Sequence, residues 1–171
     1  MLVRRATPQD ADAFAAVVAS VAAEGRWIGT QPPVDVAALA ERMRGKIEEG
    51  VDALWVLEDD RAVIGTLGLH ATGVDGVMGL GMCIVEHARG RGGGRAFMEA
   101  ALAWARASPL HKVELEVWPD NERAIALYKA YGFEREGLRR DHYRRRDGTL
   151  RSSVLMALVL GDPQSRSPDG T

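Results

Sequence analysis

The sequence predicts a single domain of the α/β class, in which strands and helices are mixed along the chain. Three observations support this class. Apolar residues recur with the period of a strand in some segments and of a helix in others, no internal repeat or interdomain linker divides them, and 171 residues suit one hydrophobic core. We place the domain at residues 1–160. Residues 161–171, "GDPQSRSPDGT", lack apolar side chains and are expected to form a disordered tail.

The first half of the chain predicts a short edge strand, two helices and three further strands. The first helix begins at "TPQD", where Thr7 is placed as its cap and Pro8 as its first residue. The second helix has one apolar stripe, and "DDR" joins the next two strands as a hairpin. The predicted strands are residues 2–6, 53–58, 62–70 and 77–85, and the helical stripes run over residues 14–21 and 36–47.

The second half predicts two more helices and three strands. The helix at residues 94–107 is apolar on most of its circumference, so we expect it to be largely buried. A strand follows at residues 112–118, and its apolar residues alternate with glutamates. An amphipathic helix at residues 124–131 ends at Gly132. The last two strands flank "RDGT", in which Asp-Gly is a strong hairpin signal.

The composition excludes several classes of protein. A formal net charge of −2 argues against attraction of the whole molecule to nucleic acid or to anionic membranes. No apolar run is long enough to span a bilayer, and the first residues contain no apolar signal-peptide core. With Cys83 as its single cysteine, the chain forms neither an internal disulfide nor a cysteine-based zinc cluster. We therefore expect a cytoplasmic protein.

A glycine-rich segment, "EHARGRGGGRAF" at residues 86–97, combines four glycines with three arginines between a strand and a helix. Backbone N–H groups at a helix start have no intrahelical partner, and the helix dipole adds partial positive charge there. Glycines let this backbone approach a phosphate closely, and Arg89, Arg91 and Arg95 add charged donors. We infer a phosphate or pyrophosphate site. The spacing fits neither the dinucleotide fingerprint nor the P-loop, and the alternative is a turn that only packs helix on strand.

Two motifs, in the expected order, resemble the GNAT superfamily of N-acetyltransferases. The first is R-x-x-G-x-G, here Arg89, Gly92 and Gly94, which resembles the coenzyme A pyrophosphate loop of that family. The second is "LEVWPDNERAIALYKAYGF" at residues 115–133, which resembles its strand-plus-helix segment. The resemblance covers most of the chain. It implies a mixed, twisted sheet with helices on both faces, in which strands "LGMCIV" and "VELEV" run parallel and then splay apart, commonly at a bulge in the first of them.

The resemblance also implies where acetyl-CoA, the expected co-substrate, would bind without any metal. Its pantetheine arm would lie in the gap between the splayed strands, beside the backbone of Met82, Cys83 and Ile84. Asn121 would bond the same arm, although it is equally placed to cap the following helix. The pyrophosphate would be held by Arg89, Gly90, Arg91, Gly92, Gly93, Gly94 and Arg95. This chain departs from many members in having "VEHA" in place of a proline before the loop. It also has Gly93 in place of an isoleucine or leucine, which should loosen the turn.

The chemistry implied by the resemblance is direct attack of an amine on the thioester. It needs a neutral amine, a stabilised oxyanion and a protonated leaving thiolate. The resemblance makes Tyr128 the candidate acid, although this residue is also placed to fill the core. It makes Glu116 the candidate base, and the alternative is a solvated strand carboxylate such as Glu114. We interpret Cys83 as a small buried residue and not as an acyl carrier.

The acceptor is not specified by these motifs. The resemblance places its binding wall in residues 24–33 and in the last hairpin. Glu24 and Trp27 are candidates to hold a cationic amine, although a helix-end charge and a packed aromatic explain them equally well. The run "RRDHYRRR" at residues 139–146 either attracts an acidic acceptor or RNA, or is a solvated face.

We therefore predict an acetyl-CoA-dependent N-acetyltransferase acting on a small amine or a protein N-terminus. Its expected partners are acetyl-CoA and this acceptor, without a membrane, and a homodimer is left open. The alternative is a non-catalytic acyl-CoA-binding module that docks an acidic partner. Both Glu116 and Tyr128 are present, which favours the enzyme because a binding module needs neither.

Overall fold

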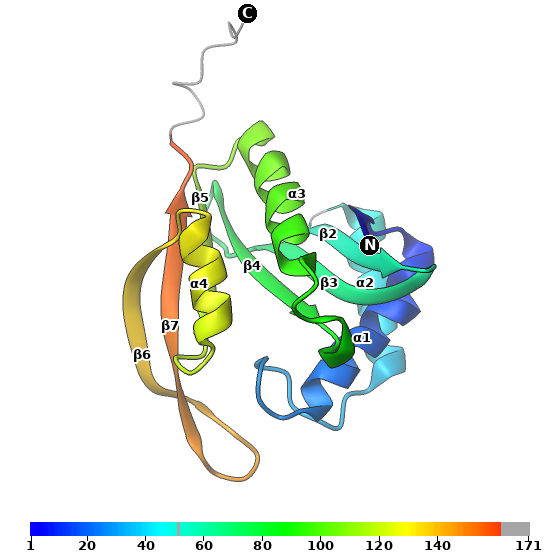
Figure 1. Ribbon diagram of the computed structural model, residues 1–171, viewed down its shortest axis with the longest axis horizontal. Helices are drawn as coiled ribbons and strands as arrows, with labels where there is room; N and C mark the ends of the chain where they lie inside the picture. Colours follow the sequence, from blue (N-terminus) through cyan, green and yellow to red (C-terminus); the bar gives the residue numbers. More distant parts are fainter. Residues whose placement is uncertain (51, 162–171) are drawn as a thin grey trace, which may run out of the picture.

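A mixed seven-stranded sheet forms the centre of the structure, a computed structural model that describes residues 1–50 and 52–161 (Figure 1). The strands follow the order β1-β2-β3-β4-β5-β7-β6, and β4 and β5 are parallel neighbours. Their bounds are β1 (Leu2–Arg5), β2 (Ala53–Asp59), β3 (Ala62–Ala71), β4 (Val77–Ile84), β5 (Lys112–Val117), β6 (Glu134–Arg144) and β7 (Leu150–Val159). The predicted α/β class is confirmed. Apart from Gly161, the tail expected at residues 161–171 lies outside the described residues.

Helices cover both faces of the sheet. In Figure 1, α3 and α4 lie in front of it, and α1 and α2 lie behind β2 and β3. Their bounds are α1 (Ala11–Ala23), α2 (Val36–Glu49), α3 (Gly93–Ala107) and α4 (Glu122–Ala130), with short 3-10 helices η1 (Pro8–Asp10) and η2 (Glu86–Ala88). These elements confirm the periodicity-based predictions, with ends that differ by a few residues.

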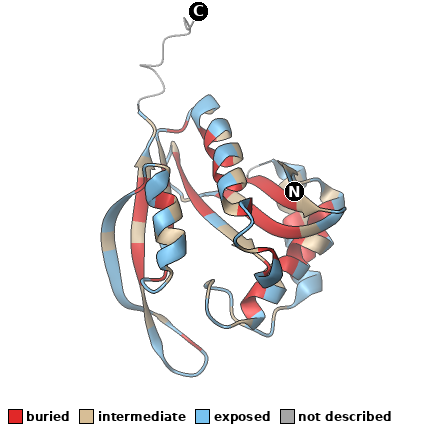
Figure 2. Cartoon of the chain, in the orientation of Figure 1, coloured by how far each residue is buried: buried red, intermediate tan, exposed pale blue. Residues whose placement is uncertain are grey.

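Strand β2 shows how the two layers of helices share one sheet. Trp55 and Leu57 pack in the larger core, which α3 covers, whereas Leu54 and Val56 pack against α1 and α2. All four are buried because both faces of β2 are covered. Each such apolar side chain contributes about 1.5–3 kcal/mol on burial. Figure 2 shows the contrast with the edge strand β6, which is exposed along most of its length.

The buried carboxylate of Asp10 links the start of the first helix to β1, the strand at the edge of the sheet opposite β6. Asp10 accepts hydrogen bonds from both Nη1 and Nη2 of Arg4, at 2.7 and 2.8 Å. It also accepts from the backbone N–H and the hydroxyl of Thr7, at 2.7 and 2.8 Å, which completes the cap predicted for this helix start. The Arg4 guanidinium holds the pKa of Asp10 well below its usual range.

The parallel strands β4 and β5 separate along their length, as expected. Their pairing covers Val77–Gly79 and Lys112–Glu114, although both strands continue well beyond it. The expected bulge was wrong, because β4 stays in register with β3 from Met78 to Ile84 without a shift. Each strand instead keeps its other neighbour, β3 or β7, so the sheet opens into two halves.

Candidate active site

A cavity of about 770 Å³ opens where β4 and β5 separate. It reaches both faces of the sheet, because α4 contributes to its wall on one face and the loop between α1 and α2 contributes on the other. The lining residues are Val21, Trp27, Ile28, Gly29, Leu80, Gly81, Met82, Cys83, Ile84, Arg89, Gly90, Gly92, Gly94, Arg95, Glu116, Val117, Trp118, Asn121, Arg123, Ala124, Ala126, Leu127, Tyr128, Ala130, Tyr143 and Ser153.

The open edge of β4 presents backbone groups to this cavity. The N–H of Val85 donates to the carbonyl of Ile64 on β3, at 3.0 Å. Successive residues of a strand point their N–H groups to opposite sides, so those of Met82 and Ile84 point away from β3 and into the gap. Beyond Gly79 no strand of the described residues lies beside them. An extended ligand chain could therefore pair with β4 as an additional strand would.

The glycine-rich loop brings backbone close to the same cavity. Gly90 and Gly92 have φ of +83° and +92°, which side chains disfavour, and Gly92 precedes the first residue of α3. Among the predicted arginines, Arg95 lines the cavity, whereas Arg91 is outside the wall and donates to Asp59 at 2.8 Å. The cavity therefore has a helix N-terminus and a cationic side chain at this end.

Gly93 lies in a closely packed part of the turn, and the expectation that it loosens this turn stays a prediction. It is buried at the start of α3 and does not line the cavity. A Cβ at this position would lie 2.5 Å from Cδ2 of Leu57 and 3.1 Å from Cδ1 of Ile84. These neighbouring side chains fill the space that a larger residue would take, so the turn is packed without one.

Arg89 links the loop to the end of α1. Its Nη1 and Nη2 donate to the two carboxylate oxygens of Glu24, at 2.7 and 2.5 Å, and its Nε donates to the carbonyl of Ile84 at 2.8 Å. Arg89 lines the cavity, but Glu24 does not. The guanidinium lowers the pKa of Glu24. The structure therefore gives the Glu24 carboxylate a cationic partner within the chain, and a role toward an acceptor stays a prediction.

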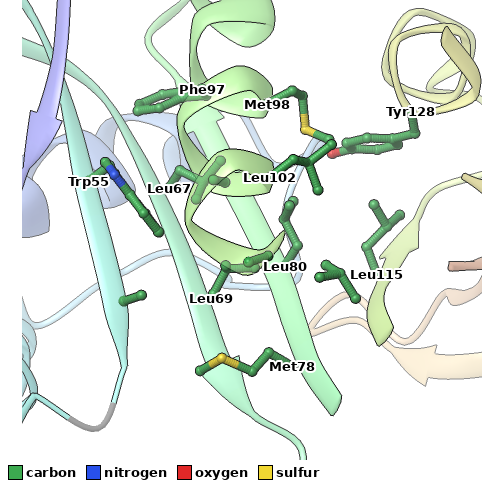
Figure 3. Packing of buried hydrophobic residues seen from close by; sticks show 14 of the residues in the cluster. Trp55, Leu67, Leu69, Met78, Leu80, Phe97, Met98, Leu102, Leu115 and Tyr128 are labelled. Carbon is green, nitrogen blue, oxygen red and sulfur yellow. The ribbon is translucent and has the colours of Figure 1, made fainter. Parts of the chain in front are cut away.

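Tyr128 lies both in the core and on the cavity wall. It belongs to the larger hydrophobic cluster, and Figure 3 shows its ring pointing from α4 toward Met98 and Leu102 of α3. Its hydroxyl makes no hydrogen bond within residues 1–50 and 52–161. Burial raises the pKa of Tyr128 well above its usual value, so the phenol stays protonated at neutral pH. The geometry is compatible with an acid role and with packing.

Glu116 is held by three donors that the sequence analysis did not identify. Its Oε1 accepts from Nη1 of Arg139 at 2.6 Å, and its Oε2 accepts from the hydroxyls of Tyr143 and Ser153, at 2.7 and 2.6 Å. Burial and this carboxylate raise the pKa of Tyr143, which keeps the phenol a donor. A carboxylate has about four lone-pair sites, so roughly one is left for an amine or a water. Glu116 is therefore not the freely solvated strand carboxylate that was the alternative, because three side chains bond to it.

Two further candidates lie on the wall in ordinary structural roles. The side-chain oxygen of Asn121 accepts from the N–H of Ala124 at 3.2 Å and caps α4, which leaves its amide NH₂ for a ligand. The thiol of Cys83 lies 3.4 Å from the hydroxyl of Thr66. Burial of the thiol raises the pKa of Cys83, which opposes thiolate formation, and the residue as a whole has intermediate exposure on the cavity wall.

The loop after α1 and the β6–β7 hairpin meet beside Glu116. Nη1 of Arg145 donates to the carbonyl of Gly29 at 2.9 Å, and Nη1 of Arg151 donates to the carbonyl of Arg26 at 2.7 Å. The candidate Trp27 lines the cavity on this side, as does Trp118, which the sequence analysis did not identify as a site residue. Contacts between residues more than 110 positions apart leave no local signal in the sequence.

The described part of the chain has neither a metal-binding cluster nor a membrane-spanning helix. No group of three or more histidine, cysteine, aspartate or glutamate side chains is placed to hold a metal ion there. No helix there is long and apolar enough to cross a membrane. No histidine is among the lining residues of the cavity.

The chain is similar to known acetyltransferases in sequence and in fold. Residues 21–133 match the model of the acetyltransferase (GNAT) family. Over 56 residues the chain is 46% identical to N-alpha-acetyltransferase RimI of Mycobacterium tuberculosis, and this match spans 33% of the chain and 34% of that relative. Ribosomal-protein-alanine N-acetyltransferase from Brucella melitensis has a similar structure, with a TM-score of 0.84 and 22% identity over 93% of this chain and 99% of that one. The structure of a phosphinothricin acetyltransferase from Sinorhizobium meliloti in complex with acetyl-CoA is also similar. Its TM-score is 0.84 and its sequence identity is 22%, over 99% of this chain and 94% of that one.

Proposed function

Because the chain belongs to the acetyltransferase (GNAT) family, we propose that it transfers an acetyl group from acetyl-CoA to a primary amine of a small molecule or a protein N-terminus. The observation that carries this proposal is one cavity that contains the glycine-rich loop, the open edge of β4, Glu116 and Tyr128. A cytoplasmic location stays a prediction.

The cavity offers a fitting place for acetyl-CoA. The loop from Gly90 to Arg95 supplies backbone N–H groups at the start of α3 for the pyrophosphate. The gap-facing N–H groups of Met82 and Ile84 suit an extended pantetheine arm and a thioester carbonyl. Arg123 lines the same cavity from α4 and makes no ion pair within the described residues, so its guanidinium, which lies against Gly90, adds a cation beside the loop. The coenzyme supplies the activated acetyl group.

The reaction exchanges a C–S bond for a C–N bond. A neutral amine nitrogen attacks the thioester carbon, the oxyanion is stabilised by a β4 amide, and the C–S electron pair leaves with sulfur. Glu116, fixed by Arg139, Tyr143 and Ser153, accepts the amine proton directly or through water. Tyr128 donates its phenolic proton to the departing thiolate. Holding both substrates in one cavity supplies much of the rate enhancement.

A panel of amines and N-terminal peptides tests the function. Each acceptor is incubated with acetyl-CoA, free thiol is recorded, and a reaction without acceptor controls for hydrolysis. We expect acceptor-dependent thiol release and an acetylated product by mass spectrometry. Tight coenzyme binding by calorimetry, with no thiol release for any acceptor, would instead favour the non-catalytic acyl-CoA-binding module.

A further inference from the structure

Gly81 is an exposed residue in the middle of β4, which is a central strand of the sheet. The residues before it in this strand, Val77–Leu80, are buried, and the burial ends at Gly81. The strand itself is regular here, because its pairing with β3 runs through Gly81 without a shift. Gly81 lines the cavity at the point where β5 no longer pairs with β4. Its exposure therefore comes from the gap between the two strands.

The backbone at Gly81 does not require a glycine. Its φ lies outside the left-handed region that favours this residue, and an added Cβ would meet no other described atom within 4 Å. Two neighbouring strand glycines differ in this respect. A Cβ at Gly68 would lie 2.8 Å from Cδ2 of Leu54, and one at Gly79 would overlap the ring of His70. A glycine inside a strand weakens the strand and often marks a close approach by a ligand.

The strand register shows which face of the sheet Gly81 belongs to. Leu54, Gly68 and Gly81 form one row across β2, β3 and β4, and Leu54 packs against α1 and α2. Directly paired residues of a sheet lie on the same face. The glycine-rich loop leads into α3, which covers the opposite face (Figure 1). A side chain at residue 81 would therefore point away from the loop that we expect to hold the coenzyme.

Gly81 and Glu116 occupy corresponding positions on the two sides of the gap. The parallel pairing of β4 with β5 ends where Gly79 meets Glu114. Two residues further along a strand, the side chain returns to the same face. Gly81 and Glu116 would be the next pair on this face, but the strands have separated and both residues line the cavity. A space without a side chain therefore lies across the gap from the candidate base.

The cavity wall on this face is mostly apolar. Val21 of α1 and two residues of the following loop, Trp27 and Ile28, line it. Glu116 is the one carboxylate among the lining residues that the structure describes. A polyamine, whose several cations would each need an anionic partner, fits this composition poorly. An acceptor with one amine and carbon substituents beside it fits better.

We propose that Gly81 determines acceptor specificity, because its missing side chain leaves room for the groups on the carbon that bears the amine. The proposal rests on the proposed acetyl transfer and names its substrate class: primary amines whose nitrogen is bonded to a branched carbon. With the amine at Glu116, the branches of this carbon lie in the space in front of Gly81. A side chain at residue 81 takes this space from the acceptor and leaves the coenzyme site open.

A series of matched acceptors tests the proposal with the intact protein. Glycinamide, alaninamide and valinamide differ only in the groups on the carbon that bears the amine. Acetyl-CoA-dependent thiol release gives kcat/KM for each, and we expect the native protein to use all three. Gly81→Ala should lower kcat/KM for valinamide about tenfold or more relative to glycinamide, because the added methyl group fills the space that the branches need. Gly81→Val should extend the loss to alaninamide.

Coenzyme binding and stability separate recognition from damage to the fold. Gly81→Ala should keep the native acetyl-CoA affinity in calorimetry and the native melting temperature, because the added Cβ meets open space. Gly137→Ala on β6 is the matched strand variant. A Cβ there would lie in ordinary contact with Leu155, 3.6 Å from its Cδ1, and Gly137 does not line the cavity. This variant should leave the preference among the three amines unchanged.

The outcomes distinguish this inference from the proposed function. If Gly81→Ala keeps the native preference, or loses glycinamide and valinamide equally, Gly81 does not determine specificity. A loss of acetyl-CoA affinity in Gly81→Ala overturns the proposal as well, because the residue then belongs to the coenzyme site. The same holds for a native protein that releases thiol with other amines and with none of these three. Absence of thiol release with every amine contradicts the proposed acetyl transfer itself.

Discussion

Tyr128 and Glu116 face one cavity but are held in opposite ways. Tyr128 is surrounded by apolar side chains, and its hydroxyl is free of hydrogen bonds within the described residues. Glu116 is fixed by three hydrogen bonds from β6 and β7. Apolar burial favours a neutral phenol that keeps its proton. At the scale of single residues, the environments therefore provide a protonated phenol at Tyr128 and a carboxylate fixed in position at Glu116.

Tyr128→Phe separates catalysis from packing. The change deletes the hydroxyl and keeps the ring in the core, so the melting temperature and acetyl-CoA affinity should stay nearly constant. If Tyr128 protonates the thiolate, turnover should fall on the order of a hundredfold, because positioning and oxyanion stabilisation remain. Tyr131→Phe is the comparison variant: its hydroxyl bonds Glu99 and the carbonyl of Arg95 instead of facing the core, so its acetyl-CoA affinity is measured alongside its turnover. Near-normal turnover, with chemistry limiting the rate, would assign Tyr128 to the core alone.

Glu116→Gln should change the pH dependence as well as the rate. If Glu116 removes the amine proton, turnover should fall most at moderate pH. It should recover partly as rising pH supplies neutral amine from solution. The control is Glu114→Gln on the same strand, because Glu114 does not line the cavity. A pH profile lowered by one constant factor would contradict the base role.

At the scale of elements, the start of α3 joins a strand, a loop and a helix at one point. Gly90 and Gly92 adopt positive φ, and Gly94 lines the cavity. The same few residues therefore determine where the helix begins and how closely a ligand can approach its N-terminus.

Gly94→Val tests this loop as the coenzyme site. A Cβ at residue 94 lies 3.0 Å from Cδ2 of Leu127, a flexible side chain, so the fold should tolerate the change. The added methyl groups should weaken acetyl-CoA binding by roughly tenfold or more, since they keep the phosphates from the backbone N–H groups. Gly45→Val on α2, where a Cβ meets nothing within 4 Å, is the matched control. Unchanged affinity in calorimetry would remove the loop from the site.

The elements could be predicted from sequence because their signals are local. The spacing of apolar residues, the residues at helix ends and the Asp-Gly turn identified each helix and strand. The partners in the site could not be predicted in this way. Glu24 and Arg89 are 65 positions apart, and Glu116 and Ser153 are 37 apart. Such contacts depend on strand order and on how the sheet opens, which no local pattern specifies.

At the scale of the whole molecule, the buried Asp10 joins β1, an edge strand, to the start of α1. Its folded pKa lies below the roughly 3.9 of an unfolded aspartate. A depressed folded pKa means that its stabilising contribution is fully present above about pH 4 and is lost as pH falls below that value.

Asp10→Asn should therefore destabilise the protein in a pH-dependent way. We expect the free energy of unfolding at pH 7 to fall by roughly 2–4 kcal/mol, because Arg4 and Thr7 lose their common acceptor. The difference from the native protein should shrink below about pH 4. Urea unfolding at both pH values measures it, with Asp12→Asn, whose side chain is 79% exposed, as the control. An equal loss at both pH values would show that shape, and not charge, is responsible.

The short pairing of β4 with β5 has a mechanical consequence. Because this pairing covers Val77–Gly79 and Lys112–Glu114, a short contact joins the two parts of the sheet, β1–β4 and β5–β7. A ligand bound in the gap contacts both parts of the sheet. Its binding to the folded state then raises the free energy of unfolding of the protein. Occupancy of the gap therefore determines how strongly the two parts of the sheet are held together.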